Sequence, residues 1–457
     1  MSCMTKIGVI AVVAATVGIS GPVSTQSLEE TLVRAYEGNP TLKSERARLR
    51  ATDERVPQAL SNWRPTISVS GSYGWERNDA TTTGPQAKEA DITEPLSGSL
   101  TIRQNLYRGG RTSAATKEAE NNVKAVRSRV SVVEQLVLLS ATTAYADVVR
   151  DQAVLELNNN NERVLRRQLE ATRDRFRVGE VTRTDVSLAE SRLSRAQADR
   201  IAAEGSLTGS RASYENVVGV VPGTLKLAKP LSDLPKTLAE AVELAKKNNF
   251  TVRQTRFIER AAENNVQEVA GELLPTFSLN GSLSTTEEAV NRKSDSQTVT
   301  VTAQVSMPLY SSGSVASRVR EAKQVVSQRR DEFSQAVRDA TEAASSAWQA
   351  LETARAQIQA FSAAVKAAEI ALEGVREEAN VGSRTVLDVL DAEQELLDAR
   401  VGLVRALRDE LVATYRLRQA VGELTAQKLG LPVVIYNVET NYRRVRNKWW
   451  GLGIDKE

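Results

Sequence analysis

The chain of 457 residues has no histidine and a single cysteine. Without histidine it lacks the commonest general base and the commonest metal ligand of proteins. The cysteine, Cys3, lies close to the N-terminus, so the rest of the chain can form neither a disulfide nor a thiolate metal site. Catalysis would have to rest on carboxylates, lysines or hydroxyls. We therefore predict that the protein is not an enzyme and that it holds no cofactor or metal ion.

Aromatic residues are also scarce, at 4% of the chain, and the charges nearly balance, with 60 basic against 57 acidic residues. Few bulky side chains suit long, closely packed helices better than a thick globular core. The formal net charge of +3 gives no sign of a nucleic-acid partner. We interpret basic pairs such as Arg443-Arg444 as solvated faces or tails.

The main apolar run covers residues 7–19, follows Lys6 and ends before Pro22. This order predicts a signal peptide over residues 1–25. The run is too short to cross a bilayer as a helix. A buried N-terminal helix is the weaker alternative, because the run is apolar on every face. We expect no later stretch to be hydrophobic enough for a transmembrane helix, so any membrane contact would have to be made by strands.

Four segments, each of roughly the length of a transmembrane β-strand, alternate between apolar side chains and Ser, Thr, Asn or Gln. They are residues 65–75, 99–106, 276–283 and 298–305. A half-buried hairpin of a soluble protein gives the same alternation, and for one segment alone it is the better interpretation. Four such segments behind an export signal favour the membrane.

Each pair of strands is followed by an unusually long helical pattern. Residues 111–178 contain neither Gly nor Pro, and residues 314–381 contain only Gly374. At 1.5 Å per residue each helix would be about 100 Å long, with apolar residues at the three-four spacing of a coiled coil. The return helices, about residues 185–219 and 388–422, are shorter by nearly half. We expect the helices that precede the strands to stack end to end on them.

The turns between these helices match each other. VGEVTRTDVSLAE (178–190) and VGSRTVLDVLDAE (381–393) share Val, Gly, Thr, Asp, Ala and Glu at a constant spacing of 203 positions, as between 178 and 381. The chain is therefore predicted to be an internal duplication. We predict that repeat 1 covers residues 26–221, with a β-hairpin at about 65–107 and a helical hairpin at 111–219. A linker over residues 222–236 leads to repeat 2 over residues 237–424, with a β-hairpin at about 275–310 and a helical hairpin at 314–422. An irregular tail over residues 425–457 would follow.

Two β-hairpins cannot close a barrel, and open sheet edges are not tolerated in lipid. Several chains must therefore share one barrel. Eight strands from two protomers would be filled by side chains, whereas twelve strands from three would leave a lumen. We predict an α+β membrane protein that forms a homotrimer, with a transmembrane β-barrel shared by three protomers, a long antiparallel α-helical coiled-coil barrel and pseudo-sixfold symmetry.

This organisation resembles the TolC family of outer-membrane channel tunnels of Gram-negative bacteria. The resemblance covers roughly residues 27–422 and rests on the duplicated order, on Leu-Tyr-x-x-Gly after each hairpin and above all on VGSRTVLDVLDA. It implies a channel in the cell outer membrane that extends through the periplasm. The resemblance also implies two partners, a periplasmic adaptor (membrane fusion) protein and an inner-membrane transporter, either ABC-type or proton-driven. Cargo would be small toxic compounds or type I-secreted proteins.

Several residues of the two turns suit helix ends. Gly179 and Gly382 would end helices as C-cap glycines do. Thr182 and Thr385 are placed as N-caps, with Asp185 and Asp388 at the third helical position of a capping box. Capping is therefore one interpretation of these two carboxylates, and a place in a pore ring is the other. Asp391, one turn further along the same face as Asp388, is explained less well by capping.

Arg384 precedes a helix N-terminus, where a cation is disfavoured, so we expect its partner to be a carboxylate on a neighbouring hairpin or protomer. The resemblance implies that Arg384 and Asp185 belong to the links of an iris-like gate. Asp388 and Asp391 would ring the periplasmic entrance. The tip turns at Gly179, Thr182, Gly382 and Thr385 would contact the adaptor. The family's gate tyrosine falls at Ala379, so one link is missing or replaced.

A structural periplasmic coiled-coil scaffold is the alternative function. It would explain the long helices, but it explains neither the four alternating strands nor an export signal without another anchor. A carboxylate-based hydrolase is a distant third, since no paired acids fall in a predicted cleft.

Overall fold

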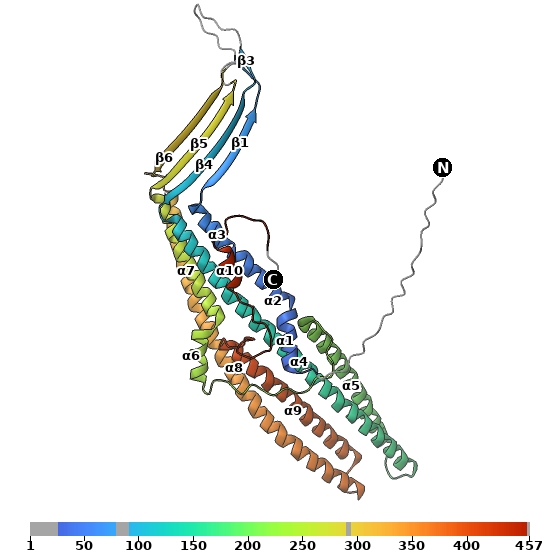
Figure 1. Ribbon diagram of the computed structural model, residues 1–457. Helices are drawn as coiled ribbons and strands as arrows, with labels where there is room; N and C mark the ends of the chain where they lie inside the picture. The colour runs from blue at the N-terminus through green and yellow to red at the C-terminus, as the bar shows by residue number, and fades with distance from the viewer. Residues whose placement is uncertain (1–25, 79–90, 289–293, 455–457) are drawn as a thin grey trace, which may run out of the picture.

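The computed structural model describes residues 26–78, 91–288 and 294–454. Figure 1 shows an elongated molecule with a small sheet at one end and two long helical hairpins reaching away from it. The predicted signal peptide, residues 1–25, lies outside the described residues.

The elements follow the duplicated order. The helices are α1 (Leu28–Gly38), α2 (Pro40–Asp53), α3 (Arg55–Leu60), α4 (Arg111–Arg177), α5 (Arg183–Val218), α6 (Leu238–Asn248), α7 (Phe250–Ala270), α8 (Ser314–Asn380), α9 (Val386–Ala420) and α10 (Thr440–Val445), with short 3-10 turns η1 (Ser61–Trp63) and η2 (Gly271–Leu273). The strands are β1 (Thr66–Tyr73), β2 (Glu76–Asn78), β3 (Asp91–Thr93), β4 (Leu96–Arg108), β5 (Thr276–Glu287) and β6 (Ser296–Ser306).

The four predicted strands form one antiparallel sheet in the order β1-β4-β5-β6. Val69, Leu100, Leu283 and Val299 lie in one row across it. The next row, on the opposite face, is polar, and there the Ser70 and Ser99 hydroxyls are 2.8 Å apart. The sheet therefore has one apolar and one polar face, as the alternation predicts. The pair β2 and β3 extends the first hairpin and is not part of the prediction.

The two long helices are equal in length, with 67 residues in α4 and 67 in α8. Each is on the order of 100 Å long. Their return helices have 36 residues in α5 and 35 in α9. Figure 1 shows the two pairs as neighbouring hairpins that point the same way.

An asparagine fixes the root of each return helix. Asn39 Nδ2 donates to the Val217 carbonyl at 3.0 Å, and Asn249 Nδ2 donates to the Ala420 carbonyl at 3.2 Å. Both asparagines also cap the helix that follows them, α2 or α7. The helices that precede the strands thus continue the return helices, which confirms the expected end-to-end stacking.

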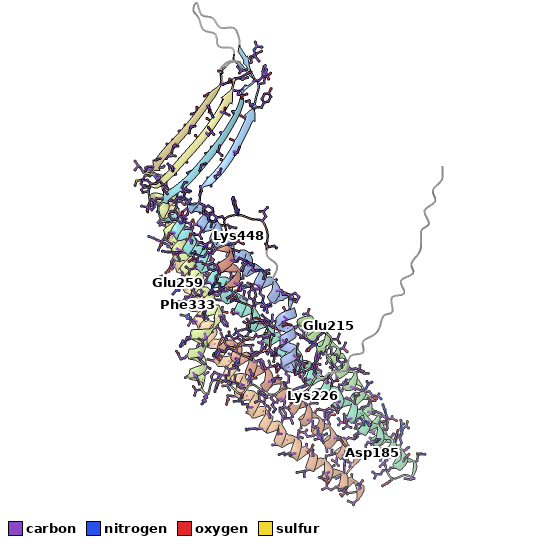
Figure 2. All side chains as sticks on the ribbon, viewed as in Figure 1. Asp185, Glu215, Lys226, Glu259, Phe333 and Lys448 are labelled. Carbon is purple, nitrogen blue, oxygen red and sulfur yellow. The ribbon has the colours of Figure 1, made fainter. Side chains whose placement is uncertain are left out.

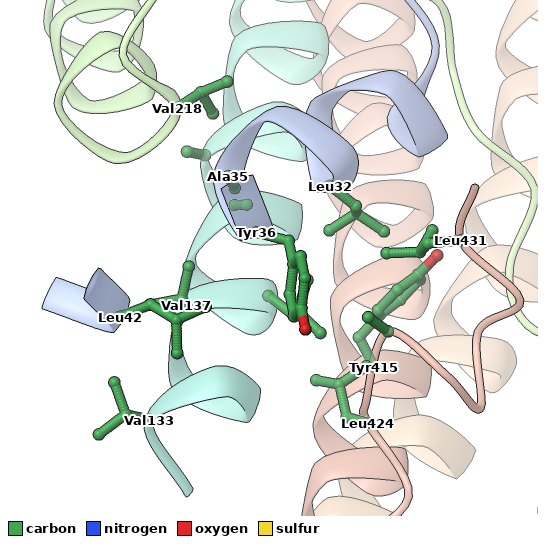
Figure 3. Packing of buried hydrophobic residues seen from close by; sticks show 14 of the residues in the cluster. Leu32, Ala35, Tyr36, Leu42, Val133, Val137, Val218, Tyr415, Leu424 and Leu431 are labelled. Atoms are coloured by element: carbon green, nitrogen blue, oxygen red, sulfur yellow. The ribbon is translucent and has the colours of Figure 1, made fainter. Parts of the chain in front are cut away.

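The largest core lies halfway along the molecule. Leu32 and Tyr36 of α1, Val137 of α4, and Tyr415 of α9 are all buried there (Figure 3). Leu424 and Leu431, which follow α9, complete the cluster. Segments from both ends of the chain therefore meet in one core.

The tail that follows residue 424 was expected to be irregular. It contains one short helix, α10, and it packs on the earlier helices: the Tyr442 hydroxyl bonds Glu120 on α4 at 3.2 Å, and Asn441 Nδ2 donates to Asp53 on α2 at 2.8 Å. Tertiary contacts therefore order a segment that has little regular structure of its own.

One expectation about hydropathy is wrong. Among the described residues, α4 contains a window that is long and apolar enough to cross a membrane by length and composition alone. However, 56% of that window is buried inside the protein. Val133, Val137 and Leu138 of α4 belong to the largest core.

Candidate functional site at the helical hairpin tips

The two hairpin tips lie next to each other at the end opposite the sheet, where Figure 2 labels Asp185. An apolar cluster joins them behind the turns. It contains Leu165 and Leu169 of α4, Ala189 and Ala196 of α5, and Val386 and Leu390 of α9. The side chains that project from these tips are therefore held on packed helices.

Both turns begin with a glycine in the left-handed region, with φ of 80° at Gly179 and at Gly382. A side chain is strained in this conformation, whereas glycine adopts it freely. The amides of the next residues, Glu180 and Ser383, each donate at 2.9 Å to a carbonyl five residues earlier. The predicted C-cap glycines are confirmed.

The two return helices, α5 and α9, both begin with a complete capping box. The Asp185 amide donates to Thr182 Oγ1 at 3.3 Å, and Asp185 Oδ2 accepts from the Thr182 amide at 2.8 Å. Asp388 and Thr385 repeat this arrangement, at 3.3 and 2.9 Å. The Thr385 amide and hydroxyl, with a smaller contribution from Arg384, lower the pKa of the Asp388 carboxyl. The capping interpretation of both aspartates is confirmed.

The partner expected for Arg384 is corrected. Its Nε donates at 2.8 Å to Oε2 of Glu378, which lies in the last turn of α8 in the same hairpin. The five-residue turn folds Arg384 back over that helix end, so a carboxylate six positions earlier is nearer than any on another hairpin. The hydrogen bond to Glu378 raises the pKa of Arg384. The Asp185 carboxylate accepts hydrogen bonds from Thr182 and forms no ion pair with any of the described residues.

An ion pair between the two hairpins does exist, and sequence analysis missed it. Arg192 Nη2 on α5 lies 2.5 Å from Asp391 Oδ1 on α9. The two residues are 199 positions apart, and no local pattern relates them. Asp391 does lie one turn beyond Asp388, as predicted, but it faces a cation of the neighbouring hairpin.

Within each hairpin, an arginine–glutamate pair near the tip also joins the long helix to its return helix. Arg173 of α4 bonds Glu190 of α5 at 2.6 Å, and Arg376 of α8 bonds Glu393 of α9. These two pairs are related by the same spacing of 203 positions as the turns (173 to 376, for example). The positions that correspond to Arg192 and Asp391 hold Glu395 and Leu188, so this ion pair has no counterpart in the duplication.

Ala379 lies in the last turn of α8, where its carbonyl accepts from the Gly382 amide at 3.1 Å. Its methyl group offers no hydrogen bond. No cluster of three or more acidic side chains suited to a metal ion occurs in the described ranges.

Comparison with known proteins identifies the architecture. Residues 31–220 and 241–423 match the family described as outer membrane efflux protein. The chain belongs to this family. It is 36% identical to the outer membrane efflux protein BepC of Brucella suis, over 96% of each chain. It is 28% identical to the outer membrane protein TolC of Vibrio cholerae, over 93% of this chain and 97% of that one. It is 30% identical to the proteases secretion protein PrtF of Dickeya chrysanthemi, over 63% of this chain and 64% of that one.

Solved outer membrane channels have the same fold. The CmeC outer membrane channel of Campylobacter jejuni aligns with a TM-score of 0.80 at 15% identity, over 93% of this chain and 90% of that one. The outer membrane protein VceC of Vibrio cholerae aligns with a TM-score of 0.75 at 18% identity, over 86% of this chain and 96% of that one. The expected fold class, localisation in the outer membrane and resemblance to TolC are thereby confirmed. The protein belongs to a family of efflux and secretion channels, not of known enzymes.

Proposed function

We propose that three copies of this chain form a channel that spans the periplasm and exports cargo through the outer membrane. The observation that carries the proposal is the four-stranded sheet, in which β1 and β6 each have one unpaired edge. In lipid such edges must be paired. Pairing β1 with β6 of a neighbour would close a barrel of twelve strands around the polar face, with the apolar row of Val69 and Val299 toward lipid.

The channel would work with a periplasmic adaptor and an inner-membrane transporter. The support is the likeness of the two tips, which expose equivalent turns around Gly179 and Thr182 and around Gly382 and Thr385. Val178 and Val381 are exposed at the same place on each turn. An adaptor that recognises one turn could therefore recognise both, and six similar sites would surround the tip of a trimer.

The tip would act as an iris-like gate. Asp388 and Asp391, on successive turns of α9, would line the periplasmic entrance in three copies. The pair between Arg192 and Asp391 would hold the second hairpin to the first while the channel is closed. Arg384 and Asp185 would contribute through the turns that they stabilise.

Cargo falls into two classes by the names of the relatives, efflux for BepC and protease secretion for PrtF. The test compares a strain that lacks this chain with the same strain carrying it. We expect a heat-modifiable trimer in outer-membrane fractions. Loss of drug resistance would identify small toxic compounds as cargo, and loss of a secreted protein would identify type I secretion. A protein that fractionates with soluble periplasmic contents, with neither phenotype, would instead support the scaffold.

A further inference from the structure

The last described residues expose an unusual amount of apolar surface. Trp449 is 68% exposed, Trp450 91%, Leu452 104% and Ile454 92%. A single exposed apolar residue is common on any protein. Four large ones within six positions form a patch, and patches of this kind mark interaction sites.

This patch is fixed beside the sheet. The Arg64 guanidinium, two residues before β1, stacks on the Trp449 ring at 4.8 Å, and its Nη1 donates to the Lys448 carbonyl at 2.7 Å. Figure 2 labels Lys448 near the helix end of the sheet. Arg446 Nη2 also bonds Glu120 of α4 at 3.1 Å, which secures the segment just before the patch. The patch therefore lies level with the point where the strands begin.

The chemistry of the segment matches a membrane interface. Tryptophan combines a large apolar ring with an N–H donor and gathers at the boundary between headgroups and acyl chains. Basic residues precede it, among them Arg443, Arg444 and Lys448. Cations beside an apolar segment attract anionic phospholipid headgroups. Edge strand β1, which begins two residues after Arg64, also exposes the apolar side chain of Ile67.

We propose that residues 449–454 lie in the periplasmic leaflet of the outer membrane and, with the basic residues before them, bind its phospholipids. The residues matched to the family end at 423, so this segment is additional to the matched architecture. It would fix the height of the barrel in the bilayer from the periplasmic side. The proposal depends on outer-membrane localisation and not on the gate.

A spin label can measure the depth of this segment, because the chain contains no cysteine besides Cys3. Leu452→Cys is labelled in full-length protein carrying Cys3→Ser and reconstituted in phosphatidylethanolamine–phosphatidylglycerol vesicles. The matched control is Val434→Cys, an equally apolar position of the same tail that is 91% exposed. Power saturation then gives the accessibility of each label to oxygen, which enters the acyl region, and to a water-soluble nickel chelate.

We expect an oxygen-to-nickel ratio at 452 roughly fivefold above that at 434, as suits a segment lying within the boundary of headgroups and acyl chains. Equal ratios at the two positions would place the patch in water and overturn the proposal. A label at 452 that is immobile and shielded from both reagents would also overturn it, because the patch would then contact a neighbouring protomer. Removing Trp450 by Trp450→Ala in the labelled chain should lower the ratio toward that of the control.

Discussion

Removing the ion pair between Arg192 and Asp391 should open the channel. Their side chains are 25% and 56% exposed, so the charges are partly solvated. Such a pair stabilises a structure by about 0.2–1 kcal/mol. Three copies in a trimer would contribute about 0.6–3 kcal/mol, which changes the ratio of closed to open channels by about 3- to 150-fold.

The assay is conductance of the purified trimer in planar bilayers, with uptake of a large antibiotic by whole cells as a second readout. We expect Arg192→Ala and Asp391→Ala each to raise the open fraction within that range. The exchange of charges in Arg192→Asp with Asp391→Arg should restore closure. Rising salt should narrow the difference from the unchanged protein, because ions screen exposed charges.

The matched control is Arg173→Ala, which removes a pair of similar length inside the first hairpin. Because this pair does not join the two hairpins, its loss should leave conductance close to normal. If Arg173→Ala opens the channel as much as Arg192→Ala, general weakening of the tip is the cause. Failure of the charge exchange to restore closure would also refute the specific role of the pair.

Three further outcomes follow from the contacts. Thr385→Ala removes the hydroxyl that accepts a hydrogen bond from the Asp388 amide, so the first turn of α9 should lose about 1 kcal/mol of local stability. The loss should appear as faster hydrogen exchange at the amides of that turn. Thr385→Ser, which keeps the hydroxyl, should not show it. Gly402→Ala would put a Cβ 2.5 Å from the Phe361 ring and should lower the free energy of unfolding by about 1–3 kcal/mol. A thermal melt should show this loss, and adding Phe361→Leu should relieve it. An unchanged melting temperature would mean that the ring moves aside freely. Burial raises the pKa of Glu134 above 4.5, and the hydrogen bond from the Ala426 amide only partly opposes this. The folded state therefore favours the protonated carboxyl. The free energy of unfolding that this protonation contributes is lost as pH rises through the raised pKa. Glu134→Gln keeps an acceptor for the amide and cannot ionise, so its Tm should match the unchanged protein at acidic pH and exceed it near neutral pH; a constant difference would contradict this.

Periodicity was enough to predict the main elements. The alternation in residues 65–75 and the three other segments predicted the strands and their faces, because a side-chain period of two leaves little choice of which face meets lipid. The duplicated Gly and Thr at 179, 182, 382 and 385 located the turns, because each residue type has a specific role at a helix end.

Contacts between distant segments could not be predicted in the same way. Arg192 has no counterpart that singles it out, since its duplicate position holds Glu395. Within the chain, Arg384 pairs with Glu378 of its own hairpin and not with the other hairpin. Dipole reasoning says that a cation there needs a partner, but it does not say where the folded turn will bring one. The tail has no periodicity, and its order comes from residues such as Leu431 and Tyr442 that meet helices more than 300 positions earlier.

The two asparagines at the roots of the return helices give each hairpin the properties of a lever. The 36 residues of α5 extend about 54 Å from the bond between Asn39 and Val217 to the tip. A tilt of about 5° at that root would move the tip by about 5 Å over this length. Arg192 lies about 39 Å from the end of α5 at Val218, so the same tilt would move it by about 3.4 Å, more than the 2.5 Å that separates it from Asp391. A small rearrangement near the main core would therefore be enough to separate these two charges near the hairpin tips.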